Sequence, residues 1–205
     1  MGTKPRVWYP GAAYHVTARG NHKNDIFKDK QDFQVYLSII EQAIEYYENM
    51  YEVICYCLMT NHVHMLVETK EKQLGYFVGR VNSMYAKYFN SKYDYVGHLF
   101  QDRYFSSLIE NCGQMLVTSQ YIHLNPVRAN MVNTTEDYEW SSYSMIIGLR
   151  KEKLIKCNKI LSHFHEKNSR ERYKEFVLAP QVKLSPDQAD KIVKTKRRAG
   201  LGVKN

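Results

Sequence analysis

Two histidines separated by one residue, His62 and His64, are the side chains whose type and spacing most directly suggest chemistry. Residues two apart in a β-strand lie on the same face, so both imidazoles would point the same way and could bind one metal ion. Val63, between them, and the apolar residues 65 and 67 would form the opposite face. The alternation predicts a strand with an apolar face toward the core and an open metal site on its other face.

A second pair of the same kind is formed by His163 and His165. The flanking residues favour a helix there, and residues two apart on a helix diverge by about 200°. We therefore expect that this second pair does not form a metal site.

Tyr121 and Asn125 form the other candidate set, because a spacing of four places both on one face of a helix. Two imidazoles and one amide oxygen suit Mg²⁺ or Mn²⁺ and leave coordination positions open for a phosphate oxygen. A tyrosine beside such a phosphate could act as a nucleophile. Taken on periodicity alone, Tyr121 is more often a packing residue than a nucleophile.

Other reactive side chains are expected to have structural roles. Tyr85 and Tyr88 follow the apolar stripe of a helix, which favours packing. His123 would point away from the side of the helix that carries Tyr121. Cys55 and Cys57 share a strand face but have no second thiol pair nearby, which is typical of core residues.

The elements that must position these residues follow from periodicity and from turn and cap signals. We expect strands over residues 14–20, 51–59, 62–69 and 103–110, and helices over residues 29–49, 74–90 and 112–124, with Pro126 ending the third helix or starting a new segment. The order βαββαβα predicts an α+β fold with a ferredoxin-like βαββαβ sheet, followed by the helix that carries Tyr121. A further helix is expected over residues 159–177. The predicted division is a domain of residues 1–143 and a mainly helical extension of residues 144–205 with a basic tail.

The composition favours a globular protein with a polyanionic partner. The chain has 205 residues, 44% of them apolar and 24% charged, which excludes disordered and collagen-like classes. A net charge of +8 and a pI near 9.2 suggest nucleic acid, on whose unpaired bases some of the 17 tyrosines could stack. No apolar run is long enough to cross a membrane, and no signal peptide is evident, so we expect a cytoplasmic protein.

The segments Asn61-His-Val-His-Met-Leu66 and Tyr121-Ile-His-Leu-Asn-Pro-Val-Arg128 resemble the signatures of single-tyrosine HUH transposases. The resemblance is to the REP-associated tyrosine transposases and the related insertion-sequence transposases. It extends from about Tyr9 to Tyr143 and includes further matching segments: Arg19-Gly-Asn21, Ile26-Phe27, Tyr88-Phe-Asn90, Gly97-His-Leu-Phe-Gln-Asp-Arg103 and Trp140-Ser-Ser-Tyr143.

The resemblance implies a role for each matching residue. Tyr121 corresponds to the nucleophile that attacks a DNA phosphodiester, forms a 5′-phosphotyrosine and releases a 3′-hydroxyl. His62 and His64 correspond to the metal-binding pair. Asn125 corresponds to the third ligand of Mg²⁺ or Mn²⁺, where the insertion-sequence branch usually has Gln; Asn is one methylene shorter, so the helix must lie closer to the strand.

The resemblance implies that the partner is single-stranded or hairpin DNA, and that a monomer or a homodimer binds it. No membrane partner is expected. Arg19, Lys23, Arg103 and Arg128 flank the matching segments and are candidates for phosphate contacts, although each could equally be a solvated surface charge. The alternative function is a catalytically inactive nucleic-acid-binding regulator on the same fold. A hydrolase of small phosphates has little support, because no carboxylate-rich cluster is evident.

Overall fold

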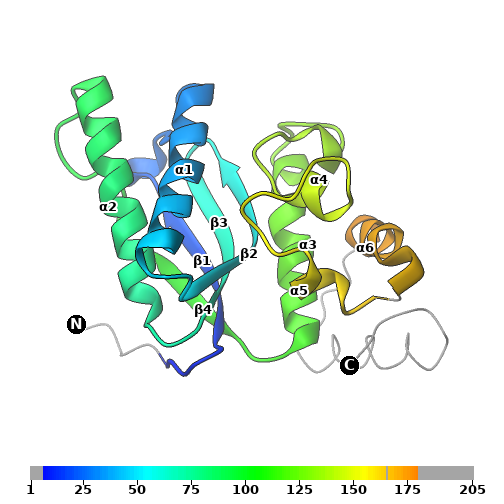
Figure 1. Cartoon of the computed structure of the whole chain (residues 1–205). Coiled ribbons are helices and arrows are strands. Elements are labelled where there is room, and N and C mark those ends of the chain that lie inside the picture. The colour runs from blue at the N-terminus through cyan, green and yellow to red at the C-terminus, as the bar shows by residue number, and fades with distance from the viewer. Residues whose placement is uncertain (1–6, 165, 180–205) are drawn as a thin grey trace.

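A four-stranded antiparallel sheet lies at the centre of the computed structural model, which describes residues 7–164 and 166–179 (Figure 1). Its strands are β1 (Ala13–Arg19), β2 (Tyr51–Met59), β3 (His62–Thr69) and β4 (Phe105–Ile109). Their order across the sheet is β2-β3-β1-β4, and each neighbouring pair is antiparallel. This arrangement confirms the expected ferredoxin-like topology, in which β3 lies between β1 and β2.

Helices α1 (Lys30–Tyr46) and α2 (Leu74–Tyr93) cover one face of this sheet (Figure 1). Their apolar stripes pack on the alternate strand residues that face them, all fully or almost fully buried: Tyr14, Val16, Ala18, Val63, Met65 and Val67. Helix α1 begins with a capping box, since the side chains of Asp29 and Asp32 each accept the other's backbone N–H. The hydrophobic pattern of strands and helices thus determines which sheet face is closed by α1 and α2.

Helix α3 (Cys112–Arg128) packs on the opposite face, against β2 and β3, as Figure 1 shows. The chain then forms the short helices α4 (Tyr143–Ile146) and α5 (Asn158–Leu161), and the longer helix α6 (Ser169–Leu178), which contacts α3. The described residues also form the 3-10 turns η1 (Asn21–Lys23), η2 (Thr135–Asp137) and η3 (Glu166–Asn168). The sheet is therefore enclosed between two helical layers, and the residues after β4 build the second one.

Helix α3 continues through Pro126 to Arg128, so the prediction that Pro126 ends this helix is wrong. Proline has no N–H to donate to the carbonyl oxygen of Ile122, one turn earlier. The side-chain amide of Asn125 donates to that oxygen at 3.4 Å and to the carbonyl oxygen of Tyr121 at 2.9 Å. This local replacement helps the helix to accommodate the proline.

The single helix expected over residues 159–177 is also wrong, because the chain forms α5, turns, and starts again with α6. Phe164 and Tyr173 are both buried, with ring centroids 5.8 Å apart. A continuous helix would place residues nine apart on opposite faces, about 180° from each other. The break lets both rings enter one cluster. His165 and the basic tail lie outside the described residues.

Within the described part of the chain, no helix combines the length and the apolar character needed to cross a membrane.

Candidate active site

His62 and His64 lie on the face of β3 that is turned toward α3, with their ring centroids 4.9 Å apart and the rings nearly perpendicular. In the antiparallel register, Arg19 of β1 is opposite His62, and Thr17 is opposite His64. Directly opposed residues of two strands project on the same side of a sheet, so these four side chains share one surface. The strand alternation predicted from the sequence is confirmed.

Tyr121 of α3 projects over this surface. Its ring centroid lies 5.5 Å from that of His64 and 5.9 Å from that of His15, a third histidine on the same face. The tyrosine is 37% exposed, so a ligand can reach it from solvent. Asn125 follows one helical turn later and is partly exposed. The structure thus places Tyr121 beside His64, on the sheet face that also carries His62.

The imidazoles of His62 and His64 are both held through their Nδ1 atoms. His62 Nδ1 lies 2.6 Å from Oδ1 of Asn61, the residue before it in the β2–β3 turn. His64 Nδ1 lies 3.0 Å from Nε2 of His15 and 3.2 Å from Oγ1 of Thr17. With Nδ1 engaged, Nε2 is the nitrogen of each ring that can bind a metal ion, and its direction is set by the partner of Nδ1.

Burial keeps these rings neutral. It lowers the pKa of His62 to about 4, with a further contribution from the positive charge of Arg19. The pKa of His64 falls to about 2, chiefly through burial and then through the neighbouring His62, His15 and Arg19. Neutral imidazole is the form that binds metal ions. Both rings are therefore in the neutral form at neutral pH.

Asn125 carries an amide group on the same face of α3 as Tyr121. Its amide nitrogen is turned toward the helix carbonyl oxygens of Tyr121 and Ile122, which leaves Oδ1 to face away from them. In the described residues no three His, Cys, Asp or Glu side chains form a metal-binding group. Two imidazole nitrogens and one amide oxygen suit Mg²⁺ or Mn²⁺ with open positions for substrate.

The four basic candidates occupy different places. Arg19 is exposed beside the histidines, and the guanidinium of Arg128 lies 5.4 Å from the Tyr121 ring centroid. The carbonyl oxygen of Lys23 accepts a 3.1 Å hydrogen bond from the Asn61 side chain, so η1 lies against the β2–β3 turn. Arg103 instead lines a hollow together with α2, and the structure does not group it with Tyr121.

The other reactive side chains have structural roles, as expected. His123 is fully buried, with Nδ1 2.7 Å from the Tyr173 hydroxyl and Nε2 3.0 Å from Ser142 Oγ. Cys55 and Cys57 are also fully buried, and burial raises the pKa of both thiols, so they remain protonated.

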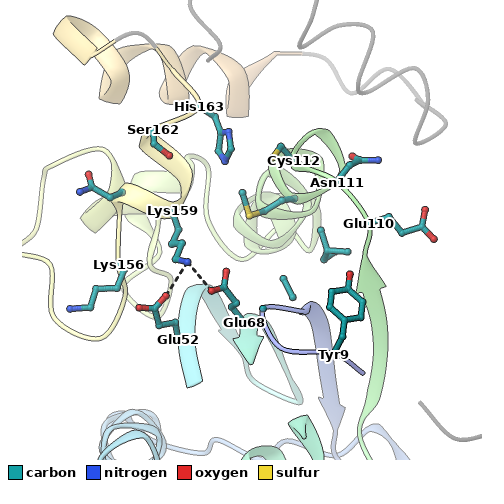
Figure 2. Close-up of a pocket in the computed structure, with 15 residues that line it drawn as sticks. Tyr9, Glu52, Glu68, Glu110, Asn111, Cys112, Lys156, Lys159, Ser162 and His163 are labelled. Atoms are coloured by element: carbon teal, nitrogen blue, oxygen red, sulfur yellow. Dashed lines mark hydrogen bonds and ion pairs between the residues drawn. The ribbon is translucent and has the colours of Figure 1, made fainter. Parts of the chain in front are cut away.

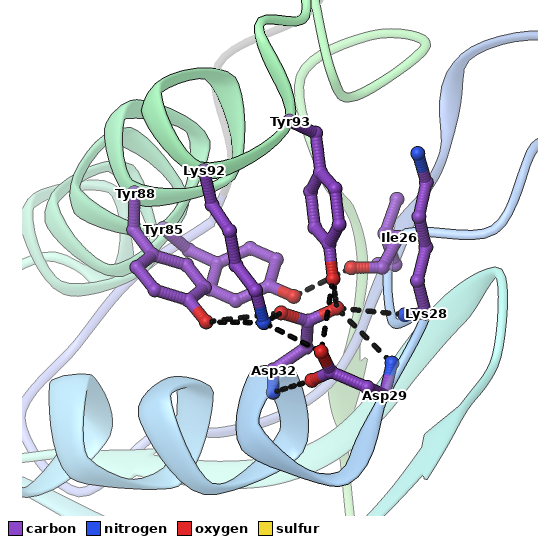
Figure 3. Close-up of polar contacts among 8 residues, drawn as sticks. All are labelled: Ile26, Lys28, Asp29, Asp32, Tyr85, Tyr88, Lys92 and Tyr93. Carbon is purple, nitrogen blue, oxygen red and sulfur yellow. Dashed lines mark hydrogen bonds and ion pairs between the residues drawn. The ribbon is translucent and has the colours of Figure 1, made fainter.

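A polar network between α1 and α2 supports the turn that precedes His62, and Figure 3 shows its side chains converging on Asp32. Asp32 is fully buried and accepts hydrogen bonds from Lys92, Tyr88 and Tyr93. The Tyr85 hydroxyl donates to the carbonyl oxygen of Ile26, and the backbone N–H of Ile26 donates to the carbonyl oxygen of Thr60 at 2.8 Å. The network thereby fixes the 24–32 segment against Thr60 and Asn61.

A hollow on the same sheet face is separate from the Tyr121 site. Figure 2 shows Lys159 between Glu52 and Glu68 there, with ion pairs of 3.2 and 2.8 Å. Glu68 lies six residues along β3 from His62, which corresponds to about 20 Å. The hollow therefore lies at the far end of the sheet.

His15 and Thr17 are the site residues that sequence reasoning missed. Both belong to the predicted first strand, and the alternation of that strand already places them on the same side as Arg19. The ferredoxin-like order puts this strand next to the one that carries His62 and His64. Combining these two inferences could have identified them from the sequence.

The chain is similar to known transposases. A family model described as "Transposase IS200 like" matches residues 9–125. A solved REP-associated tyrosine transposase bound to a REP hairpin superposes with a TM-score of 0.61 at 16% identity, covering 77% of this chain and 90% of that one. A candidate transposase from Deinococcus radiodurans R1 superposes with a TM-score of 0.41 at 17% identity, and the match covers 59% of this chain and 95% of that one. No curated protein matches. Because the family model covers more than half of the chain and includes His62, His64, Tyr121 and Asn125, this protein belongs to the IS200-like transposase family.

Proposed function

We propose that this transposase is a metal-dependent single-stranded DNA transesterase that cleaves and rejoins DNA at hairpin-bearing sites through a 5′-phosphotyrosine on Tyr121. The observation that carries the proposal is the position of the Tyr121 ring, 5.5 Å from His64 on the sheet face shared by both motif histidines. A nucleophile beside a set of groups that can bind a metal ion is an arrangement suited to phosphodiester transesterification.

In the proposed step, Tyr121 Oη attacks the phosphorus atom of a DNA phosphodiester. A bond forms between Oη and phosphorus, and the bond from phosphorus to the 3′ oxygen breaks. The phenol loses one proton and the departing 3′ oxygen gains one, so the step is balanced. Because one phosphoester bond replaces another, the 3′-hydroxyl of a strand can later reverse the exchange and rejoin DNA without ATP.

His62, His64 and Asn125 are the residues that would hold Mg²⁺ or Mn²⁺. The bound cation would stabilise the negative charge that develops on the phosphate oxygens during attack. Arg128, whose guanidinium lies 5.4 Å from the Tyr121 ring centroid, adds a fixed positive charge beside the nucleophile. Asn125 lies on the same helix face as Tyr121, so the nucleophile and one proposed ligand move as one rigid unit.

DNA is the proposed substrate for three reasons: the family, the charge of +8, and the solved relative that is bound to a REP hairpin. Arg19, Lys23 and Arg128 lie at the site or beside the turn before it and are proposed to contact phosphates. Arg103 would contact a part of the DNA further from Tyr121. A single chain supplies the tyrosine and both histidines, so a monomer is the proposed active form, and a homodimer is the alternative.

The test is covalent capture of DNA by the full chain. Hairpin oligonucleotides with single-stranded flanks are incubated with Mn²⁺ or Mg²⁺ and separated on a denaturing gel. A 3′-end label is expected to become attached to the protein, whereas a 5′-end label is expected to appear in a shortened free strand. Tyr121→Phe is expected to abolish the adduct, because it removes the attacking oxygen, while hairpin binding persists.

Tyr76→Phe is the matched control, because Tyr76 is 61% exposed on α2, across the sheet from the site. It should leave the adduct unchanged. His62→Ala should abolish metal-dependent cleavage, and Asn125→Ala should weaken it. An undiminished adduct in Tyr121→Phe would overturn the assignment, and tight binding without cleavage of any hairpin would favour the non-catalytic regulator.

A further inference from the structure

Phe105, the first residue of β4, has an exposed aromatic side chain close to the proposed active site. It is 65% exposed, whereas Leu99 and Tyr104, which precede it, are buried. Single exposed apolar side chains are common on protein surfaces, so exposure alone decides nothing. The position of this ring relative to the catalytic residues is what points to a function.

The sheet register places Phe105 on the face that carries the histidines. Thr17 of β1 is opposite Phe105 of β4 on one side and opposite His64 of β3 on the other. Residues directly opposed in antiparallel strands project on the same side, so the three side chains form a row across the sheet. Two strand spacings separate Phe105 from His64, or about 10 Å. Thr17 Oγ1 is itself 3.2 Å from His64 Nδ1.

A positive charge accompanies this ring. Arg19 lies two residues after Thr17 on β1, and therefore projects on the same face, where it is exposed. The surface beside the proposed metal ligands thus combines an accessible aromatic face with a cation. Proteins that bind single-stranded nucleic acid combine the same two features, a basic path for the backbone and aromatic rings on which bases stack.

We propose that Phe105 forms a stacking site for an unpaired nucleobase of the DNA strand whose phosphate lies at Tyr121. This inference rests on the proposed function and adds a base-binding subsite to it. In duplex DNA both faces of a base are covered by its neighbours, whereas an unpaired base has a face available to Phe105. The subsite would therefore favour single-stranded DNA and orient the strand across β1, between β4 and the histidines.

The test uses metal-free binding, which does not depend on cleavage. Three fluorescent probes are compared in EDTA by anisotropy: dT20, a 20-mer abasic strand with the same phosphates, and a 20-base-pair duplex. Phe105→Ala is expected to weaken dT20 binding about tenfold and to leave abasic-strand binding unchanged, because only dT20 can stack. Phe105→Trp is expected to retain dT20 binding.

Tyr76→Ala is the matched control, since Tyr76 is also an exposed aromatic, 61% exposed, but lies on α2. It should leave the ratio of dT20 to abasic affinity unchanged. The proposal is overturned if Phe105→Ala weakens both strands equally, if it weakens neither, or if Tyr76→Ala has the same effect. Dissociation of a dimer by Phe105→Ala with unchanged dT20 binding would also overturn it, because a second copy would then occupy the ring.

Failure of this proposal is distinguishable from failure of the proposed function. If Phe105→Ala loses the preference for dT20 but the wild-type protein forms no adduct, the stacking site at Phe105 is supported and the catalytic assignment of Tyr121 is not. If the adduct depends on Tyr121 but Phe105→Ala keeps the preference for dT20, the catalytic assignment is supported and the stacking site is not.

Discussion

Each imidazole of the His-Val-His triplet, the proposed metal-binding pair, is oriented by a side chain outside the triplet. Asn61 holds Nδ1 of His62, and His15 and Thr17 hold Nδ1 of His64. The His15 ring also stacks on His64, with centroids 5.2 Å apart and an angle of 25° between the rings. Partners of this kind orient a metal ligand and tune its basicity, so we propose that His15 is a positioning residue for His64.

His15→Phe is expected to keep the stacked ring but to remove the hydrogen bond to His64. Loss of such a partner lowers metal affinity by about 10- to 100-fold, so adduct formation should require a correspondingly higher Mn²⁺ concentration. Mn²⁺ titrations by calorimetry and by adduct yield would measure both effects, and saturating Mn²⁺ should restore the yield. His98→Phe, at an exposed histidine, is the control. Unchanged Mn²⁺ affinity in His15→Phe would contradict the positioning role.

At the scale of elements, the segment between β1 and α1 supports the β2–β3 turn. Gly20 directly follows β1, where the chain approaches itself so closely that a Cβ would collide with the carbonyl oxygen of Asn24. Burial alone would raise the pKa of Asp32, but hydrogen bonds from Lys92, the Lys28 backbone and two tyrosines hold it below its usual value. The buried carboxylate is therefore charged and ties α1 to α2.

Asp32→Asn is expected to lower the free energy of unfolding by about 2–3 kcal/mol, because it removes the buried charge to which Lys92 and two tyrosines donate. Urea denaturation followed by circular dichroism would measure the change. Glu45→Gln, at an exposed carboxylate on the same helix, should change stability by less than about 0.5 kcal/mol. Equal stability of Asp32→Asn and Glu45→Gln would show that the network contributes little.

At the scale of the whole molecule, His123 connects the helices of the second layer to one another. It projects from α3 toward Tyr173 of α6 and toward Ser142, which lies next to α4. The backbone N–H of Ser142 donates to the carbonyl oxygen of Tyr56 in β2. Burial lowers the pKa of His123 to about 3. Protonation of this ring would place an unsolvated charge between α3 and α6, so the packing of the layer requires the neutral form.

Because the folded-state pKa of His123 lies below the unfolded value of about 6.5, the unfolded chain binds a proton first as pH falls. Stability is then lost from about pH 6.5 down to about pH 3, at about 1.4 kcal/mol per pH unit for this group. Urea denaturation between pH 4 and about pH 6 should show a slope smaller by about that amount in His123→Gln than in the wild type. His98→Gln, at an exposed histidine, is the control.

If His123→Gln does not fold, an NMR titration of the wild-type protein gives the same information, and the His123 ring should remain neutral down to pH 4. A titration of His123 near pH 6.5 in the folded protein would contradict the prediction.

The sequence alone determined the features that depend on local periodicity. Strands β2 and β3 have the expected bounds, 51–59 and 62–69, because alternation with period two is visible within one segment. The shared face of His62 and His64, and that of Tyr121 and Asn125, follow from strand and helix geometry alone. The order and spacing of the motifs indicated the transposase family, and the family model that matches residues 9–125 shows it.

Only the tertiary structure decided which distant residues meet. His15 reaches His64, and Phe105 reaches the histidine face, through the registers of β1 with β3 and β4, which no single segment contains. The passage of α3 through Pro126 depends on a side-chain donor, and the break before α6 depends on Phe164 and Tyr173 sharing one core. Local sequence determines the direction of a side chain along its own element. Its neighbours depend on strand pairing and packing across the whole chain, where tertiary contacts override local preference.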